Sequence, residues 1–302
     1  MTNVEINQLL AKLREGKTRI VAKAISQIEK DTSVKQRFLF NGDTSIDVSF
    51  TIGITGPAGV GKSTIISLLI EKLQSLHDRI GVVAIDPSSC KHSGAFLGDR
   101  IRMMKAMREG RVFIRSMGSR GKEGGITPEA IAATHCLSHA GYKPVLLETT
   151  GVGQTDVSIR KRVDLLIVIV SPGMGDEIQA LKSGFSEIAD ILVINKTDHP
   201  ETDAFLNWIH RYSDLDENQL VKLNGNTGQG IDDLVDKIQA VYEAKNQSNQ
   251  NNLLQNESQG EADELLIFNE LSEILKSKIS NLLEEGWTQI EIIEKLRKSL
   301  SS

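Results

Sequence analysis

Residues 56–64, GPAGVGKST, have the residue types and spacing to bind the phosphates of a nucleotide. They fit the pattern GxxxxGK[ST], in which glycines let backbone N–H groups approach phosphate oxygens. Lys62 is expected to reach the β- and γ-phosphates, and Ser63 is expected to bind Mg²⁺. The predicted phosphate site is the whole segment: Gly56, Pro57, Ala58, Gly59, Val60, Gly61, Lys62, Ser63 and Thr64.

A second motif, NKTD at 195–198, has the chemistry to recognise a guanine base. The Asp198 carboxylate can accept hydrogen bonds from the N1–H and the 2-amino group of guanine, whereas adenine presents the wrong pattern to a carboxylate. Asn195 would contact the purine and hold the loop, and the stem of Lys196 would pack on the ring. NKxD is specific here because it follows a phosphate-binding motif. We therefore expect GTP or GDP as the bound nucleotide, rather than ATP.

A third segment, NGNTGQG at 224–230, lies where GTPases commonly carry a Ser-Ala pair beneath the base. Asn224 and Gly225 replace that pair, and Asn226 follows. We expect these three residues to lie at the base. Their replacement of the common pair bears on the affinity for the base, not on which base is bound.

Three acidic residues are candidates for holding Mg²⁺ together with Ser63. Glu148 ends the run PVLLE, where many GTPases have an aspartate that holds the ion through water. Asp86 ends another apolar run, at the sheet edge where ligands of such proteins bind. Asp99 follows in the segment LGDR. Asp86 either holds Mg²⁺ or orients the attacking water, and the sequence leaves both roles open.

The segment after Glu148 has the residues to approach the γ-phosphate and the attacking water. Gly151 lets the backbone come close to the phosphate. Gln154 could position the water, although its offset from ETTG differs from that in Ras-like proteins. Lys62, Asp86, Asp99, Glu148 and Gln154 are therefore the candidate catalytic residues. The arginines of this region act either as an arginine finger or in surface and partner ion pairs: Arg100, Arg102, Arg115 and Arg120.

The pattern of the elements that must position these residues predicts an α/β fold. Short continuous runs of Val, Ile and Leu alternate with helical stretches, as expected of strands covered by helices on both faces. The segment STIISLLIEKLQSL, directly after the phosphate motif, reads as an amphipathic helix. We predict a P-loop NTPase fold with a mostly parallel central sheet. The predicted strands are SFTIGI, GVVAID, VFIRSM, PVLLET, DLLIVIVS and ILVIN.

Four regions are expected along the chain. Residues 1–42 form an N-terminal helical extension, broken near Gly16, and residues 43–245 form the P-loop GTPase domain. Residues 246–261 are rich in Asn, Gln and Ser and read as a flexible linker. Residues 262–302 carry an apolar helical stripe and form a C-terminal helical hairpin. The stripe packs on the chain's own domain, on a second copy in a homodimer, or on a partner.

Charge and cysteine content exclude several classes of protein. A net charge of -5 gives no basic surface for general nucleic-acid binding. The 2 cysteines lie far apart, so a disulfide framework is not expected. The N-terminus lacks the features of a signal or transit peptide, and no apolar run reaches the roughly 18 residues of a membrane span. These features indicate a cytoplasmic protein that does not bind membranes.

Several segments that are not general P-loop features resemble the methylmalonyl-CoA mutase-associated GTPases, the MeaB/ArgK family. They include LGDRIRM, VFIRSMGSRG, ETTGVGQTD and SPGMGDEIQALKSG, and the resemblance covers most of residues 18–240. It implies a GTPase with a slow basal rate that is stimulated by its partner, an adenosylcobalamin-dependent acyl-CoA mutase. Such proteins gate cofactor loading and protect or reactivate the mutase. The corrinoid is expected to belong to the partner, and dimerisation through the C-terminal region is implied.

Cys90 and His92, in SCKHSG, support one alternative. Nickel-insertion GTPases of the same branch carry cysteine and histidine near this loop, and a dimer would supply four ligands for nickel or zinc. Against this, the chain has no His-rich N-terminus and resembles those proteins poorly elsewhere. Substitution on an exposed loop is the favoured interpretation of both residues.

Overall fold

The computed structural model describes residues 3–40, 50–86, 107, 109–119, 126–149, 157–173, 188–213 and 215–253. The chain divides into two compact units, Met1–Asn246 and Gln247–Ser302. The first unit contains the sheet and the loops that concern function. Of the second unit, the described residues are 247–253, which are helical.

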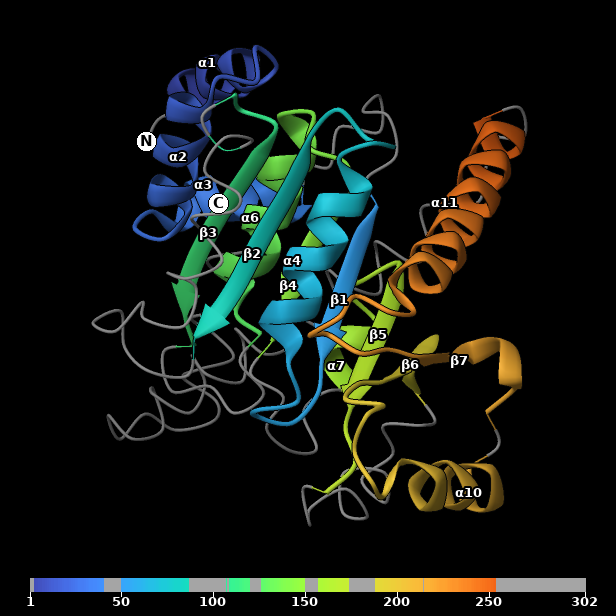
Figure 1. Cartoon of the computed structure of the whole chain (residues 1–302). Helices are drawn as coiled ribbons and strands as arrows, with labels where there is room; N and C mark the ends of the chain where they lie inside the picture. Colours follow the sequence, from blue (N-terminus) through green and yellow to red (C-terminus); the bar gives the residue numbers. More distant parts are fainter. Residues whose placement is uncertain are drawn as a thin grey trace, which may run out of the picture. The chain divides into compact units, whose positions relative to one another are not determined.

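The described strands form one seven-stranded sheet in the order β3-β2-β4-β1-β5-β6-β7 (Figure 1). Every neighbouring pair is parallel. The predicted parallel α/β sheet is therefore confirmed, and the six predicted strands are present. The short seventh strand was not predicted. The strands are β1 (Thr51–Thr55), β2 (Ile80–Asp86), β3 (Val112–Gly118), β4 (Val145–Glu148), β5 (Leu165–Val170), β6 (Ile191–Ile194) and β7 (Leu220–Lys222).

Helices cover both faces of the sheet, and each face has its own apolar cluster (Figure 1). α4 (Lys62–Leu73) and α11 (Ile231–Leu253) contribute to one cluster. The other contains residues of α6 (Pro128–His139), α7 (Val157–Arg160) and α10 (Thr202–Tyr212). Val82 and Val83, neighbours in β2, belong to opposite clusters. Burial on both faces explains why the strands read as continuous apolar runs.

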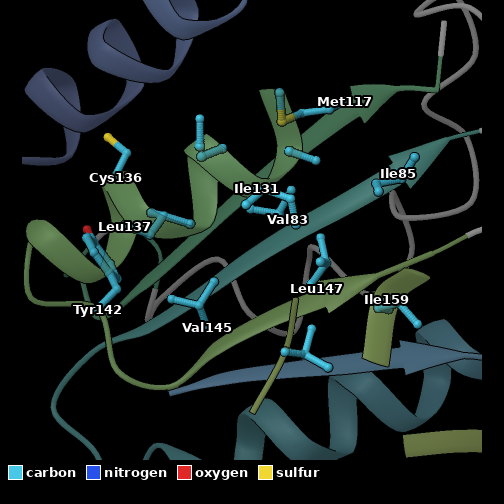
Figure 2. Packing of buried hydrophobic residues seen from close by; sticks show 14 of the residues in the cluster. Val83, Ile85, Met117, Ile131, Cys136, Leu137, Tyr142, Val145, Leu147 and Ile159 are labelled. Atoms are coloured by element: carbon cyan, nitrogen blue, oxygen red, sulfur yellow. The ribbon is translucent and has the colours of Figure 1, made fainter. Parts of the chain in front are cut away.

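Figure 2 shows part of the cluster beneath α6. The helix begins at a Thr127 cap, whose hydroxyl accepts a hydrogen bond from the Ala130 N–H at 3.2 Å. Ile131 and Leu137 from α6 pack with Val83 of β2 and other strand residues. Cys136 is fully buried here, and burial raises the pKa of its thiol well above the ordinary value. A thiol that stays protonated is inert, so Cys136 has a packing role.

The N-terminal extension consists of α1 (Asn3–Leu13), α2 (Thr18–Ile28) and α3 (Thr32–Phe40), and these helices contact α6. The expected break at Gly16 is present, where φ is +62°. Arg79 donates hydrogen bonds to the carbonyls of Gly16 (3.1 Å) and Ala140 (3.4 Å). It thereby ties the α1–α2 junction to the end of α6.

His135 in α6 makes the stability of the protein sensitive to pH. Its Nδ1 lies 2.8 Å from the Phe38 carbonyl oxygen in α3. Burial lowers the pKa of His135, and this hydrogen bond opposes the shift. The unfolded chain therefore binds a proton here more readily than the folded chain, so stability falls as the pH drops below about 6.5. We expect His135→Gln to lose less free energy of unfolding than wild type between about pH 7.5 and 5.5.

Urea unfolding of both proteins at the two pH values measures this difference. Glutamine keeps an N–H donor for the Phe38 carbonyl but does not titrate, so it isolates the proton. Equal losses of stability in wild type and variant would contradict the role given to His135.

α11 continues through the first part of the range expected to be a linker. It runs to Leu253, so residues 246–253 are helical rather than irregular. Earlier in the helix, Tyr242 packs edge-on against Phe50 and His77, with ring centroids 5.1 and 5.2 Å apart. Lys245 forms an ion pair with Asp164. The rest of the expected linker and the 262–302 hairpin lie outside the described residues. Within the described residues, no helix is both long and apolar enough to span a membrane.

Candidate functional site

The phosphate-binding segment is a tight loop between β1 and α4. Gly56, Gly59 and Gly61 have φ values of +143°, +79° and +96°. Residues that carry a Cβ rarely adopt such values. A Cβ at Gly56 would lie 2.0 Å from the Ile169 carbonyl oxygen. No side chain caps the start of α4 at Gly61. The first N–H groups of this helix therefore lack a side-chain cap, as in an anion-binding helix terminus.

Lys62 lies folded back over this loop. Its ammonium donates hydrogen bonds to the carbonyl oxygens of Gly56 (2.7 Å) and Pro57 (2.9 Å). These bonds hold the positive charge at the loop rather than in solvent. A phosphate group bound by the loop amides would therefore meet a charge that is already in place.

Ser63 and Glu148, two predicted Mg²⁺ ligands, lie together. The Ser63 hydroxyl donates to a Glu148 carboxylate oxygen at 3.2 Å. β4 pairs with β1 so that Glu148 lies beside Ile54, and Glu148 is only 7% exposed. A hydroxyl and a carboxylate are the oxygen ligands that Mg²⁺ prefers, so this pair fits the ion.

Asp86 occupies the same edge of the sheet. It is the last residue of β2, two residues beyond Ala84, which lies beside Glu148 in β4. The side chain of Asp86 lies outside the described part of the structure. Other predicted residues lie outside it too: Asp99, Gly151 and Gln154, the arginine candidates Arg100, Arg102 and Arg120, and Cys90 and His92 of the alternative.

Asn195 holds the base loop, residues 195–198, against two other loops. These are the phosphate loop, residues 56–64, and the third loop, residues 224–230. Asn195 is only 3% exposed. Its Nδ2 donates to the Val60 carbonyl at 2.7 Å, and its Oδ1 accepts from the Gly225 N–H at 2.9 Å. The sequence predicted that Asn195 would hold the loop, and these contacts show how it does so. Removing it would leave a buried carbonyl and a partly buried N–H without partners.

Lys196 and Asp198 extend from the same loop. Lys196 has a left-handed backbone, with φ +59°, and its ammonium donates to the Gly59 carbonyl at 2.9 Å. Its stem therefore spans from the base loop to the phosphate loop. Asp198 is exposed and therefore accessible to a ligand. The Thr197 N–H donates to the Leu223 carbonyl at 3.4 Å, which places Asp198 next to the third loop.

The third loop is a turn built on Asn224. Its side-chain oxygen accepts hydrogen bonds from the N–H groups of Asn226 (2.9 Å) and Thr227 (3.2 Å). Its backbone N–H donates to the Gln229 carbonyl at 3.0 Å. The contact of the Gly225 N–H with Asn195 places this turn against the base loop, and Asn224 shapes the turn.

Thr55 and Thr149 support the site but were not predicted. Thr149 donates to the Thr55 hydroxyl at 2.9 Å, and both side chains are buried. This bond joins the ends of β1 and β4 directly behind the phosphate loop and Glu148. Polar residues that end neighbouring strands are the signal that would have identified them. By contrast, Arg115 forms an ion pair with Glu29, the residue that follows α2, which favours a structural role for Arg115 over an arginine finger.

The glycines of the third loop allow a test of its backbone geometry. Gly230 has φ +86°, and a Cβ there would lie 2.0 Å from the Lys222 carbonyl oxygen. Gly228 has φ +77°, but its nearest neighbour, the Leu68 side chain, is 3.9 Å away. We expect Gly228→Ala to cost about 1 kcal/mol of unfolding free energy, from the backbone angle alone.

For Gly230→Ala we expect a loss of about 3 kcal/mol or more, because backbone must also move. Chemical denaturation of the two variants measures the difference. Equal losses would show that the Lys222 carbonyl does not confine Gly230.

These loops form one site at the carboxyl edge of a parallel sheet, where such sheets bind ligands. It combines uncapped helix N–H groups, an ammonium, a hydroxyl–carboxylate pair and an exposed carboxylate on a rigid loop. Within the described ranges, no three His, Cys, Asp or Glu side chains cluster to hold a metal ion by themselves. The arrangement suits a phosphate chain with a cation at one end and a base at the other.

Comparison with known proteins gives consistent matches. A sequence profile described as methylmalonyl Co-A mutase-associated GTPase MeaB matches residues 21–280. A Pyrococcus horikoshii protein named for an expected GTPase activity is 37% identical over 247 residues, 77% of this chain and 76% of that protein. The mouse protein named methylmalonic aciduria type A homolog, mitochondrial, is 33% identical over 201 residues, 63% of this chain and 48% of the mouse protein.

Among solved structures, a crystal structure titled LAO/AO transport system kinase matches with a TM-score of 0.58 and 19% identity. The match covers 100% of this chain and 99% of that one. At this identity it supports the shared fold alone.

Proposed function

The chain belongs to the methylmalonyl Co-A mutase-associated GTPase MeaB family, and from this premise we propose that it binds and hydrolyses GTP and assists an adenosylcobalamin-dependent acyl-CoA mutase. The observation that carries the nucleotide assignment is the buried Asn195 side chain. It joins the phosphate loop at Val60 to the third loop at Gly225. It therefore holds Asp198, which has the chemistry to recognise guanine, at a fixed distance from the phosphate site.

In this proposal the chain's own groups position the nucleotide and neutralise its charge. The loop amides and Lys62 bind the β- and γ-phosphates, and Asp198 accepts hydrogen bonds from the base. Ser63 and Glu148 would hold Mg²⁺, with Asp86 and Asp99 as further candidates. The bound ion would supply charge neutralisation at the phosphate oxygens. Gly151 would let the backbone approach the γ-phosphate. Gln154 or Asp86 would orient the attacking water.

The proposed partner is methylmalonyl-CoA mutase or a related acyl-CoA mutase. Family membership supports the association, and we propose that nucleotide state gates cofactor loading and the protection of the mutase. The corrinoid would be bound by the partner. A homodimer formed through residues 262–302 is a further part of the proposal. Nickel or zinc insertion by Cys90 and His92 is not favoured, because the family match points to the mutase.

The nucleotide part is tested by phosphate release from GTP and, in parallel, from ATP, with Mg²⁺ present and then removed by chelation. We expect slow, Mg²⁺-dependent turnover of GTP and little turnover of ATP. Equal turnover of both nucleotides would contradict guanine recognition by Asp198. Full activity after chelation would contradict the Mg²⁺ site at Ser63 and Glu148.

A further inference from the structure

We propose that His199 is a positioning residue that couples occupancy of the base site to the backbone at Gly173, just after β5. The inference rests on the proposed binding of guanine nucleotides. It goes further because it makes nucleotide affinity depend on a segment outside the phosphate, base and third loops. The link is the packing of the His199 ring against Gly173.

The backbone of His199 is fixed to the base loop and to α10. Its N–H donates to the Lys196 carbonyl at 2.9 Å. Its carbonyl accepts from the Thr202 N–H at 3.1 Å and from the Thr202 hydroxyl at 2.7 Å. His199 directly follows Asp198 in this turn. A base held by the Asp198 carboxylate would therefore restrain His199 as well.

The His199 ring has a defined orientation. Its Nδ1 accepts a hydrogen bond from the Glu201 N–H at 3.3 Å. The ring lies against Gly173, because a Cβ at Gly173 would be 2.6 Å from both Cε1 and Nε2 of His199. Gly173 also has a φ of +81°, which residues with a Cβ rarely adopt. Both the ring and the backbone angle therefore require glycine at this position.

Gly173 lies where the chain leaves the sheet. The Asn195 N–H donates to the Val170 carbonyl at 2.8 Å, and Ser171 and Pro172 are buried. Gly173 is the first exposed residue after β5. The His199 ring thus contacts the chain at the first position that the sheet no longer confines.

A contact between the base loop and Gly173 acts in both directions. If nucleotide binding restrains Gly173 through His199, then displacing Gly173 must lower nucleotide affinity by the same factor. Pushing the ring aside would break its hydrogen bond with the Glu201 N–H or shift the turn that carries Asp198. Gly173 would therefore influence nucleotide affinity without contacting the nucleotide.

The test is a double-mutant cycle on the GDP affinity of the purified full-length protein, measured by isothermal titration. Gly173→Ala places a methyl group against the ring, and we expect it to lower GDP affinity about tenfold. In a His199→Ala background the same substitution should lower GDP affinity by about twofold or less, because the ring is absent. The backbone cost of alanine at this φ is present in both backgrounds and therefore cancels.

His210→Ala is the matched control background, since His210 is an exposed histidine of α10. In that background Gly173→Ala should again lower GDP affinity about tenfold. An equal loss of GDP affinity with and without the His199 ring would overturn the inference, because Gly173 would then act independently of His199.

Hydrogen exchange tests the same link without a substitution at Gly173, in case Gly173→Ala does not fold. Saturating GDP should slow exchange of the Gly173 amide in wild type but not in His199→Ala. Equal slowing in both proteins would also overturn the inference. If wild type binds no GDP, the proposed function fails and this inference fails with it. That result is distinguishable, because it appears in wild type before any variant is compared.

Discussion

Lys62→Ala is expected to abolish GTP turnover and to weaken nucleotide binding strongly. The ammonium lies at the phosphate loop, fixed by the carbonyls of Gly56 and Pro57. Losing one charged hydrogen-bond donor costs about 1.5–3 kcal/mol, roughly 10- to 100-fold in affinity. Losing a group that stabilises transition-state charge costs about 10²–10³-fold in rate. Titration with a fluorescent GDP analogue and phosphate release from GTP measure the two effects.

Lys72→Ala is the matched control for this experiment. Lys72 lies in the same helix, and its ammonium pairs with Asp232 at 2.6 Å on the surface. Both variants remove one positive charge, but only Lys62 lies at the loop. Nucleotide binding by Lys62→Ala at wild-type affinity would show that the phosphate site has been assigned to the wrong segment.

Asp198→Asn is expected to exchange guanine preference for xanthine preference. Asparagine offers one acceptor and one donor where aspartate offers two acceptors. It can therefore accept from N1–H of xanthine and donate to the 2-oxo group, but it cannot accept from both donors of guanine. We expect GDP affinity to fall about 10- to 100-fold, in line with the loss of a charged hydrogen bond. XDP affinity should rise.

Competition of GDP and XDP for each protein measures this exchange. Asp203→Asn, an equal change of charge at an exposed position of α10, should leave both affinities as in wild type. If Asp198→Asn weakened the binding of both nucleotides alike, Asp198 would have a structural role and would not recognise the base.

The sequence was sufficient to predict the main strands and the phosphate loop for a clear physical reason. Strands buried on both faces must be apolar throughout, so runs such as ILVI at 191–194 stand out. Glycines that approach a phosphate or a neighbouring strand cannot be replaced by larger residues, and Gly56 illustrates this with a 2.0 Å approach to Ile169. Patterns fixed by sterics and by burial can be recognised without coordinates.

Other features could not be predicted because they depend on tertiary contacts. β7, Leu220–Lys222, has three residues and only one of them, Val221, is buried, so it carries no periodic signal. A flexible linker was expected from residue 246, where the Asn- and Gln-rich segment begins, yet α11 continues to Leu253. Composition identifies a segment that cannot bury much apolar surface, but it does not forbid a helix from continuing into it.

In the site, too, some features could be predicted from the sequence and others could not. Ser63, Glu148, Asn195 and Asn224 were identified from motifs, and the structure brings Ser63 to Glu148 and Asn195 to the loop that Asn224 begins. The hydrogen bond between Thr55 and Thr149 arises only when β1 and β4 pair, and the Asn224 turn depends on local backbone conformation. The sequence therefore identified the candidate ligand-binding groups better than the groups that hold them in place.

The association with a mutase is the central claim, and its most direct test is steady-state GTP turnover with increasing amounts of methylmalonyl-CoA mutase. Lys62→Ala, measured in parallel, reports any contaminating GTPase. We predict a slow basal rate that rises severalfold and saturates with mutase concentration. Wild-type protein that binds GTP but whose turnover and GTP affinity stay constant at every mutase concentration would contradict the account.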